Sequence, residues 1–170
     1  MGMTLVGLLL LLVSPAASAP VKTAIVVPGW PKLPFPFETG ILTCLVPGHP
    51  CMMHVSGLPG IDFTLKPPGI VPGGIANETR QALTNIGTVA AAAGSSLDNF
   101  MECTVLLAKG AGESAFSEMN GAYKEFFGDV KPTRAAYFVD LVGGKALVEI
   151  KCSGWAPAPS GSDTGVAVAA

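Results

Sequence analysis

An arginine and a glutamate in the second half of the chain are the residues whose types and spacing favour chemistry. Arg134 follows Pro132-Thr133 at the start of a strand-like run, and Glu149 lies in the next such run. A guanidinium can hold a carboxylate through two parallel N–H donors, and a glutamate can orient or deprotonate an attacking water. Only 13% of the residues are charged, so these two groups stand out. The pair favours recognition of an anionic substrate combined with water activation.

The strand-like runs 134–141 and 146–153 predict how these side chains are placed. Gly143-Gly144 between the runs is typical of a two-residue hairpin turn. Strand alternation in that hairpin puts Arg134 and Glu149 on one face, about 13 Å apart along the strands. A substrate and a water between them would satisfy this distance, and so would a site that takes the two groups from neighbouring subunits. Two unrelated, solvated charges are the alternative interpretation.

Strands and helices elsewhere in the chain must position this pair. Strand patterns cover 40–46, 51–55 and 100–107, and helical periodicity covers 75–93 and a segment that begins near Ser114. Together with the two runs above, the order is β-β-α-β-α-β-β. This order predicts a single α+β domain, with a mostly antiparallel or mixed sheet and both helices on one face.

The face of the sheet without helices raises the question of what covers it. The strands carry more large apolar residues than one solvated face tolerates, so both faces are expected to be apolar. The residues concerned are Val105, Leu107, Tyr137, Val139, Val148 and Ile150. We therefore expect a homo-oligomer that buries sheet faces against each other and forms sites between subunits.

Both ends of the chain predict segments outside this domain, which is expected over 37–155. Residues 1–19 combine a short apolar run with a small-residue cleavage site, typical of a secretory signal peptide. Residues 20–36 carry five prolines and predict an extended leader, and 156–170 predict a flexible tail. Lys22 and Lys32, with no acid nearby, also suit a plastid-type targeting segment behind the signal. The secretory pathway and the plastid are therefore both open destinations.

Charge and motif spacing exclude several classes of function. The formal net charge is -2 and the basic residues are scattered, which argues against a nucleic-acid surface. His49 and His54 form no zinc pattern with the cysteines, so no metal site is expected. No segment beyond the signal has transmembrane length, so a soluble protein is expected after signal removal. Asn77-Glu78-Thr79 is a glycosylation sequon, which matters only in the secretory pathway.

The four cysteines have no C-x-x-C spacing. In an oxidising compartment, Cys44 and Cys51 could close a short loop. Cys103 and Cys152 each lie within a strand-like run, where a buried free thiol is expected.

Several short motifs, in a shared order over residues 35–153, resemble the Rid family of reactive-intermediate deaminases, the YjgF-type proteins. The motifs are Val55-Ser56-Gly57, Val71-Pro72-Gly73-Gly74, Thr79-Arg80-Gln81-Ala82-Leu83, Asn85-Ile86, Ala93-Gly94, Met119-Asn120, Tyr123, Phe126-Phe127, Pro132-Thr133-Arg134 and Val148-Glu149-Ile150. The resemblance implies a chorismate-mutase-like homotrimer with active sites in clefts between subunits. It also implies hydrolysis of 2-imino acids to 2-keto acids and ammonia, without a metal or an organic cofactor.

The resemblance assigns a role to each matching residue. Arg134 would grip the substrate carboxylate and Glu149 would orient or activate the water. Asn120 and the Ser56-Gly57 turn would line the cleft.

Two positions that would also line the cleft depart from the family pattern. Phe37 stands where many members have a tyrosine hydroxyl, and Ala136 stands where many have a cysteine. These departures favour, as an alternative, a non-catalytic module that binds a small carboxylate on the same trimeric fold. RNA cleavage, known for some relatives, is disfavoured by the scattered basic residues.

Overall fold

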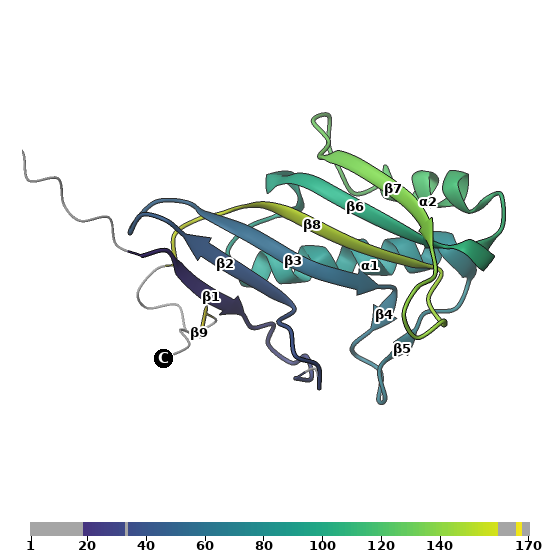
Figure 1. Ribbon diagram of the computed structural model, residues 1–170, viewed down its shortest axis with the longest axis horizontal. Helices are drawn as coiled ribbons and strands as arrows, with labels where there is room; N and C mark the ends of the chain where they lie inside the picture. Colours follow the sequence, from purple (N-terminus) through teal and green to yellow (C-terminus); the bar gives the residue numbers. More distant parts are fainter. Residues whose placement is uncertain (1–18, 33, 160–165, 168–170) are drawn as a thin grey trace, which may run out of the picture.

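The chain forms a seven-stranded sheet, two α-helices and a small hairpin within residues 19–32, 34–159 and 166–167, which the computed structural model describes (Figure 1). The strands of the sheet are β1 (Val21–Ile25), β2 (Gly40–Cys44), β3 (Cys51–Pro59), β6 (Phe100–Ala108), β7 (Thr133–Val139), β8 (Val148–Ala156) and β9 (Val166–Ala167). The helices are α1 (Gly74–Ala92) and α2 (Ala115–Tyr123), and β4 (Ile61–Asp62) pairs with β5 (Gly69–Ile70) in the hairpin. Single turns of 3-10 helix lie at Leu97–Asn99 and Lys109–Ala111.

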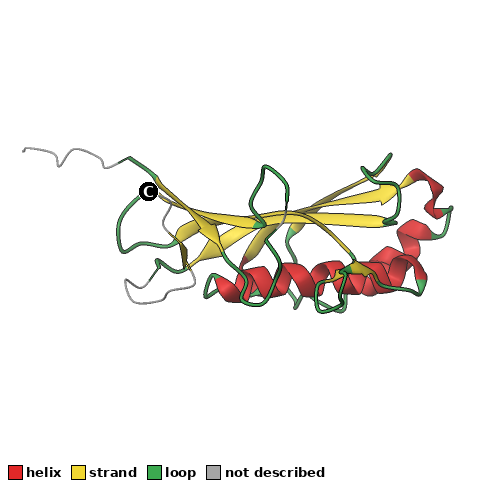
Figure 2. Ribbon diagram, turned by 90° about the horizontal axis from the view of Figure 1, so that it is seen from below, coloured by secondary structure: helices red, strands yellow, loops and turns green. Residues whose placement is uncertain are grey.

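The predicted fold class is confirmed. The strand order is β7-β6-β8-β3-β2-β1-β9, with β6 and β7 parallel and the other pairs antiparallel. Figure 2 shows both helices on the same face of the sheet. The order β2-β3-α1-β6-α2-β7-β8 is the β-β-α-β-α-β-β order expected from the sequence. We call the covered side of the sheet the helix face and the other side the open face.

The predicted hairpin between the last two long strands is wrong, because β6 lies between β7 and β8. The chain segment β6-α2-β7 is a crossover unit, and strands joined through a helix pair side by side in parallel. β7 therefore takes one edge of β6, while β8 takes the other edge. Gly143 and Gly144, with φ of 84° and 62°, lie in the loop between β7 and β8 rather than in a two-residue hairpin turn.

The apolar strand residues that suggested a two-sided apolar sheet lie mostly on the helix face. Val105, Leu107, Val148 and Ile150 are fully buried there. Tyr137, by contrast, is 57% exposed. Four of the six residues therefore belong to one core, and the expected homo-oligomer loses this support and stays a prediction.

Part of the segment expected to be a leader belongs to the domain. Residues 21–25 form β1, which pairs with β2, and the side chains of Ile25 and Val27 are buried in the core. The five prolines of residues 20–36 lie before β1 or in the loop between β1 and β2, because proline cannot donate to a strand ladder. At the other end, β9 pairs with β1. Residues 1–18 of the predicted signal peptide lie outside the described residues.

The four cysteines form two disulfides. Cys44–Cys51 bridges β2 and β3, the pairing that the sequence left open for an oxidising compartment. Cys103–Cys152 is a correction, because free thiols were predicted there. The register of β6 against β8 places these two residues directly opposite each other, with their Cα atoms 4.1 Å apart.

Helix α1 anchors the strand that carries Glu149. The apolar face of α1 packs against β3 and β8, with Leu83, Ile86 and Val89 fully buried. On the same helix, the buried Glu78 accepts a hydrogen bond from the backbone N–H of Leu147 at 2.7 Å, just before β8 begins. Within the described ranges, no helix combines the length and the apolar character needed to cross a bilayer.

Candidate active site

Arg134 and Glu149 lie on opposite faces of the sheet within one chain. Arg134 is the register partner of Cys103, which is in turn paired with Cys152, so these three side chains share the helix face. Glu149 precedes Cys152 by three positions on β8 and therefore points to the open face. The prediction of a shared face is wrong because the hairpin that would have set their register does not form.

The half-site around Arg134 is built where β7 meets α2. The guanidinium carbon lies 4.8 Å from the centre of the Tyr123 ring and 5.8 Å from that of Phe116. Its Nη1 is 3.7 Å from the sulfur of Met119. These contacts hold the side chain through weak, mostly aromatic interactions. Arg134 is exposed, so its N–H donors stay open to an anionic ligand.

Tyr123 is a polar contributor to this half-site. Its ring is buried, and among the described residues its hydroxyl has no hydrogen-bond partner. Burial raises the pKa of Tyr123 to about 12, while the charge of Arg134 acts in the opposite direction. The phenol therefore stays neutral and keeps a hydrogen-bond donor next to the arginine.

Asn120 and Ala136 are on the same side of the molecule as Arg134. Asn120 is half-buried on α2, one residue after Met119. Ala136 is two residues after Arg134 on β7 and therefore shares its face, where its methyl group packs against the core. Its side chain has no polar atom to offer, so only its backbone can contact a polar ligand.

The half-site around Glu149 is built where β8 meets β3. A bulge in β3 between Val55 and Leu58 contains Gly57, and a Cβ atom at Gly57 would collide with Oε1 of Glu149. The carboxylate therefore lies directly over the glycine backbone, a close approach that only glycine permits. Glu149 is half-buried, and this burial raises the pKa of its carboxyl group.

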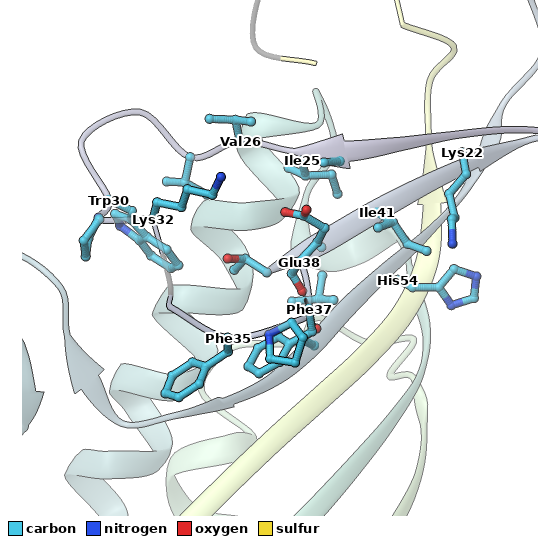
Figure 3. A pocket seen from close by; sticks show the side chains of 18 residues that line it. Lys22, Ile25, Val26, Trp30, Lys32, Phe35, Phe37, Glu38, Ile41 and His54 are labelled. Carbon is cyan, nitrogen blue, oxygen red and sulfur yellow. Dashed lines mark hydrogen bonds between the residues drawn. The ribbon is translucent and has the colours of Figure 1, made fainter. Parts of the chain in front are cut away.

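Ser56 connects the Glu149 half-site to the loop before β2. Its Oγ donates to the carbonyl of Glu38 at 2.6 Å, and its backbone N–H donates to the carbonyl of Thr39 at 2.9 Å. These bonds place Phe37 beside the bulge. Phe37 and Ser56 both line a hollow of about 1090 Å³ on the open face, between the strands β1 to β3 and the loop 26–39 (Figure 3).

The predicted site residues thus fall into two half-sites. Arg134, Asn120 and Ala136 lie on the helix face or on the helix that covers it, and we call them the arginine half-site. Phe37, Ser56, Gly57 and Glu149 form the glutamate half-site at the open face. In the part of the chain that the structure describes, no three His, Cys, Asp or Glu side chains are arranged to hold a metal ion.

Comparisons with known proteins decide the family. A family model described as Endoribonuclease L-PSP matches residues 49–154. A 2-iminobutanoate/2-iminopropanoate deaminase from Bos taurus is 41% identical over 99 residues, which are 58% of this chain and 69% of the relative. The human protein of the same description is 36% identical, with the same coverage. A crystal structure from Yersinia pestis, of the conserved Rid protein family, superposes with a TM-score of 0.65 at 27% identity, covering 78% of this chain and 98% of that one.

The chain belongs to the Rid family.

The family match covers both half-sites except for one residue. Ser56, Gly57, Asn120, Arg134, Ala136 and Glu149 lie within residues 49–154, whereas Phe37 lies before them. The wall of the hollow that the loop 26–39 supplies therefore belongs to a part of this Rid protein outside the family match.

Two contributors to the site are not evident from the sequence. The helical spacing of Tyr123 indicates a core residue, but not that its ring lies beneath Arg134, because that contact depends on the β6-α2-β7 crossover. Phe35 stacks in parallel on Phe37, with ring centroids 5.5 Å apart. The Phe-Pro-Phe sequence at 35–37 is the one local signal that could have indicated this pair.

Proposed function

We propose that this Rid protein hydrolyses reactive 2-imino acids to 2-keto acids and ammonia, in sites formed between subunits of a homotrimer. The observation that carries the proposal is the separation of the two half-sites. Arg134 and Glu149 face opposite sides of one sheet, so a single chain cannot apply both groups to one small substrate. A second copy that sets its open face near the arginine half-site of the first would complete the site.

In the proposed reaction, Arg134 holds the substrate carboxylate through its planar fork of donors. Glu149 accepts a proton from a water molecule as the water oxygen bonds to C2 of the protonated imine. This step produces a carbinolamine. Glu149 then returns the proton to the nitrogen, and the C–N bond breaks with ammonia as the leaving group. The hydroxyl proton passes to Glu149 as the keto oxygen forms, and from Glu149 to the ammonia, which leaves as ammonium. The balance is one iminium and one water consumed, with one keto acid and one ammonium formed.

The environment of Glu149 supports its role as the base in this scheme. The imine carbon is already electrophilic, so positioning and proton transfer supply the catalysis without a covalent intermediate. Burial raises the pKa of Glu149. A carboxylate whose pKa lies nearer to neutral is a stronger base than an ordinary solvent-exposed one.

The relatives support the substrate class. The bovine and human proteins at 41% and 36% identity are described as 2-iminobutanoate/2-iminopropanoate deaminases. We extend the 2-imino acid class to this chain, because Arg134 is suited to the carboxylate that all such substrates carry.

An assay that generates imines tests the proposed activity. An amino-acid oxidase produces the imino acid in place, and formation of the keto acid is followed with and without the purified protein. We expect faster keto-acid formation with the wild type and a large loss with Arg134→Ala. Equal rates for the two proteins would contradict the mechanism. Calorimetric binding of a 2-keto acid without any imine turnover would instead identify a non-catalytic carboxylate-binding module.

We also propose that the protein works in an oxidising compartment of the secretory pathway. The two disulfides, Cys44–Cys51 and Cys103–Cys152, support this, because disulfides persist in such compartments and are rare in the cytosol. Alkylation of the native protein without reduction, followed by mass spectrometry, should find all four cysteines blocked. The mature N-terminus of the native protein distinguishes secretion from delivery to a plastid.

A further inference from the structure

The loop between β1 and β2 gives this Rid protein an aromatic wall beside the glutamate half-site. Residues of the segments 26–32 and 34–39 line the hollow of about 1090 Å³, and both segments lie outside the stretch that matches the family model. Phe35 and Phe37 line the hollow together with Ser56 (Figure 3). Ser56 is followed directly by Gly57, on which the Glu149 carboxylate lies. Neither Gly57 nor Glu149 lines the hollow itself, so Ser56 is the residue that connects the wall to the group proposed to activate water.

Contacts at both ends hold this loop in place. At its start, Val27 is buried and the Trp30 ring stacks on Phe63, with ring centroids 4.1 Å apart. At its end, the two hydrogen bonds from Ser56 hold the carbonyls of Glu38 and Thr39. Phe37 directly precedes the anchored Glu38, and Phe35 stacks on Phe37. A ligand that packs on the two rings therefore has little ordering cost to meet at this end of the loop.

The two rings form a paired apolar surface that the single chain leaves uncovered. They are stacked with an interplanar angle of 1°, and Phe35 and Phe37 are 57% and 50% exposed. Large apolar side chains at such exposure gain free energy when a ligand covers them. An aromatic ligand gains more free energy than its buried area alone would give, because rings pack favourably in offset-stacked or edge-to-face arrangements.

The size of the hollow points to a bulky ligand. Sites for small molecules typically measure about 300–1,000 Å³. At about 1090 Å³, the hollow is slightly larger than that range. An imino acid of three or four carbons would fill a small part of it and would leave both rings uncovered.

We propose that the wall of Phe35 and Phe37 makes this enzyme select 2-imino acids with a large aromatic side chain over those with a short aliphatic one. The inference rests on the proposed function, since it assigns the substrate side chain of the same site. It places the side chain against the wall while the reacting carbon faces Glu149.

A comparison of two imines tests the selection. The imines derived from phenylalanine and from alanine are each generated by an amino-acid oxidase, and kcat/KM is measured for both. We expect the wild type to prefer the aromatic imine by about tenfold, the scale that a few apolar contacts supply. Phe35→Ala should lower the aromatic-to-aliphatic ratio by about the same factor. Leu45→Ala, an equally exposed apolar residue that does not line the hollow, should leave the ratio unchanged.

The possible failures are distinguishable. An aromatic-to-aliphatic ratio of kcat/KM at or below one in the wild type, or the same ratio in Phe35→Ala, overturns the selection. Turnover of either imine would still support the proposed function. Absence of turnover with both imines contradicts the proposed function instead. In that case, calorimetry with phenylpyruvate and pyruvate tests the wall by itself. If the wall selects aromatic ligands, the wild type should bind phenylpyruvate more tightly than pyruvate, and Phe35→Ala should weaken this preference. An equal preference in the wild type and in Phe35→Ala would overturn the proposed selection.

Discussion

The arginine half-site and the glutamate half-site differ in how far the charged side chain is exposed to solvent. Arg134 lies on an edge strand, exposed and supported by aromatic rings. Glu149 lies on a central strand, half-buried above the backbone of Gly57. A guanidinium remains charged in either setting, so an open position suits a group that captures an anion. A carboxylate becomes a better base when burial disfavours its charge. Under the proposed mechanism, substrate binding and proton transfer therefore fall on separate surfaces of one sheet.

The largest loss of activity is expected from removing the guanidinium that is proposed to bind the substrate carboxylate. Arg134→Ala should lower kcat/KM for 2-imino acids by about 10³–10⁴-fold, because two charge-assisted hydrogen bonds of about 2–3 kcal/mol each are lost. Arg134→Lys keeps the charge without the planar fork and should recover only part of the loss. The coupled keto-acid assay measures both variants. Full activity of Arg134→Lys would show that charge alone suffices and that the fork is irrelevant.

Removing the base should cost somewhat less and should also change the pH profile. Glu149→Gln is expected to lower kcat by about 10²–10³-fold, the usual contribution of a positioned general base. In the wild type, activity should fall as the pH drops through the raised pKa of Glu149, because the protonated form cannot accept a proton. This acidic limb should be missing in Glu149→Gln. An unchanged acidic limb in the variant would assign the titration to another group.

The same substitution should act on stability in the opposite direction. Because burial raises the pKa of Glu149 in the folded state, the ionised form opposes folding once the pH exceeds the pKa of the unfolded chain. Glu149→Gln removes that charge and should raise the Tm by a few degrees near pH 7. The difference should vanish well below the unfolded pKa, where both side chains are neutral. A lower Tm at pH 7 would indicate that the carboxylate is stabilised by partners in the assembled protein.

The two disulfides are expected to differ in how much each one stabilises the fold, and this difference is a smaller effect. Cys103 on β6 is the register partner of Arg134 on β7, and Cys152 shares β8 with Glu149. This bridge therefore joins the strand that carries Glu149 to the neighbour of the strand that carries Arg134. The bridge spans 49 residues and Cys44–Cys51 spans 7. The loop-closure argument gives about 4 kcal/mol and about 2 kcal/mol, respectively. Urea unfolding should therefore show a greater loss for Cys103→Ala/Cys152→Ala than for Cys44→Ala/Cys51→Ala. Equal losses would contradict this ranking.

The smallest effect is expected at Phe37. Phe37→Tyr introduces the hydroxyl that many Rid proteins carry at this position, next to the Ser56 turn. One added hydrogen bond of about 1 kcal/mol should change kcat/KM by about fivefold. An increase would mean that the hydroxyl contacts the transition state, whereas a decrease would mean that its desolvation outweighs any bond. A change well beyond this scale would show that Phe37 does more than line the site.

Local patterns in the sequence predict much of this fold. The helical periodicity of 75–93 corresponds to α1 (Gly74–Ala92), and the motif resemblance indicates the family and the site residues. What they cannot supply is which strands are neighbours. The Gly143-Gly144 signal is locally sound, yet the crossover through α2 places β6 between β7 and β8. That one non-local pairing decides which faces Arg134 and Glu149 occupy.

The other corrections have the same origin. Cys103 and Cys152 are 49 positions apart and meet only because β6 and β8 pair in one particular register. The proline-rich composition of 20–36 predicts a leader, but β1 needs only five residues between prolines to pair with β2. The proline content of the whole segment hides a strand this short.

Subunit mixing tests the central claim most directly. Arg134→Ala and Glu149→Gln are each expected to be nearly inactive. The two variant proteins are unfolded, mixed in equal amounts and refolded together. If each site takes the arginine from one copy and the glutamate from another, random assembly restores about one site in four. We expect about a quarter of wild-type activity, and none when either variant is mixed with the double variant. No recovery in the first mixture, with refolded oligomers present, would show that both groups act from the same chain and would contradict the account.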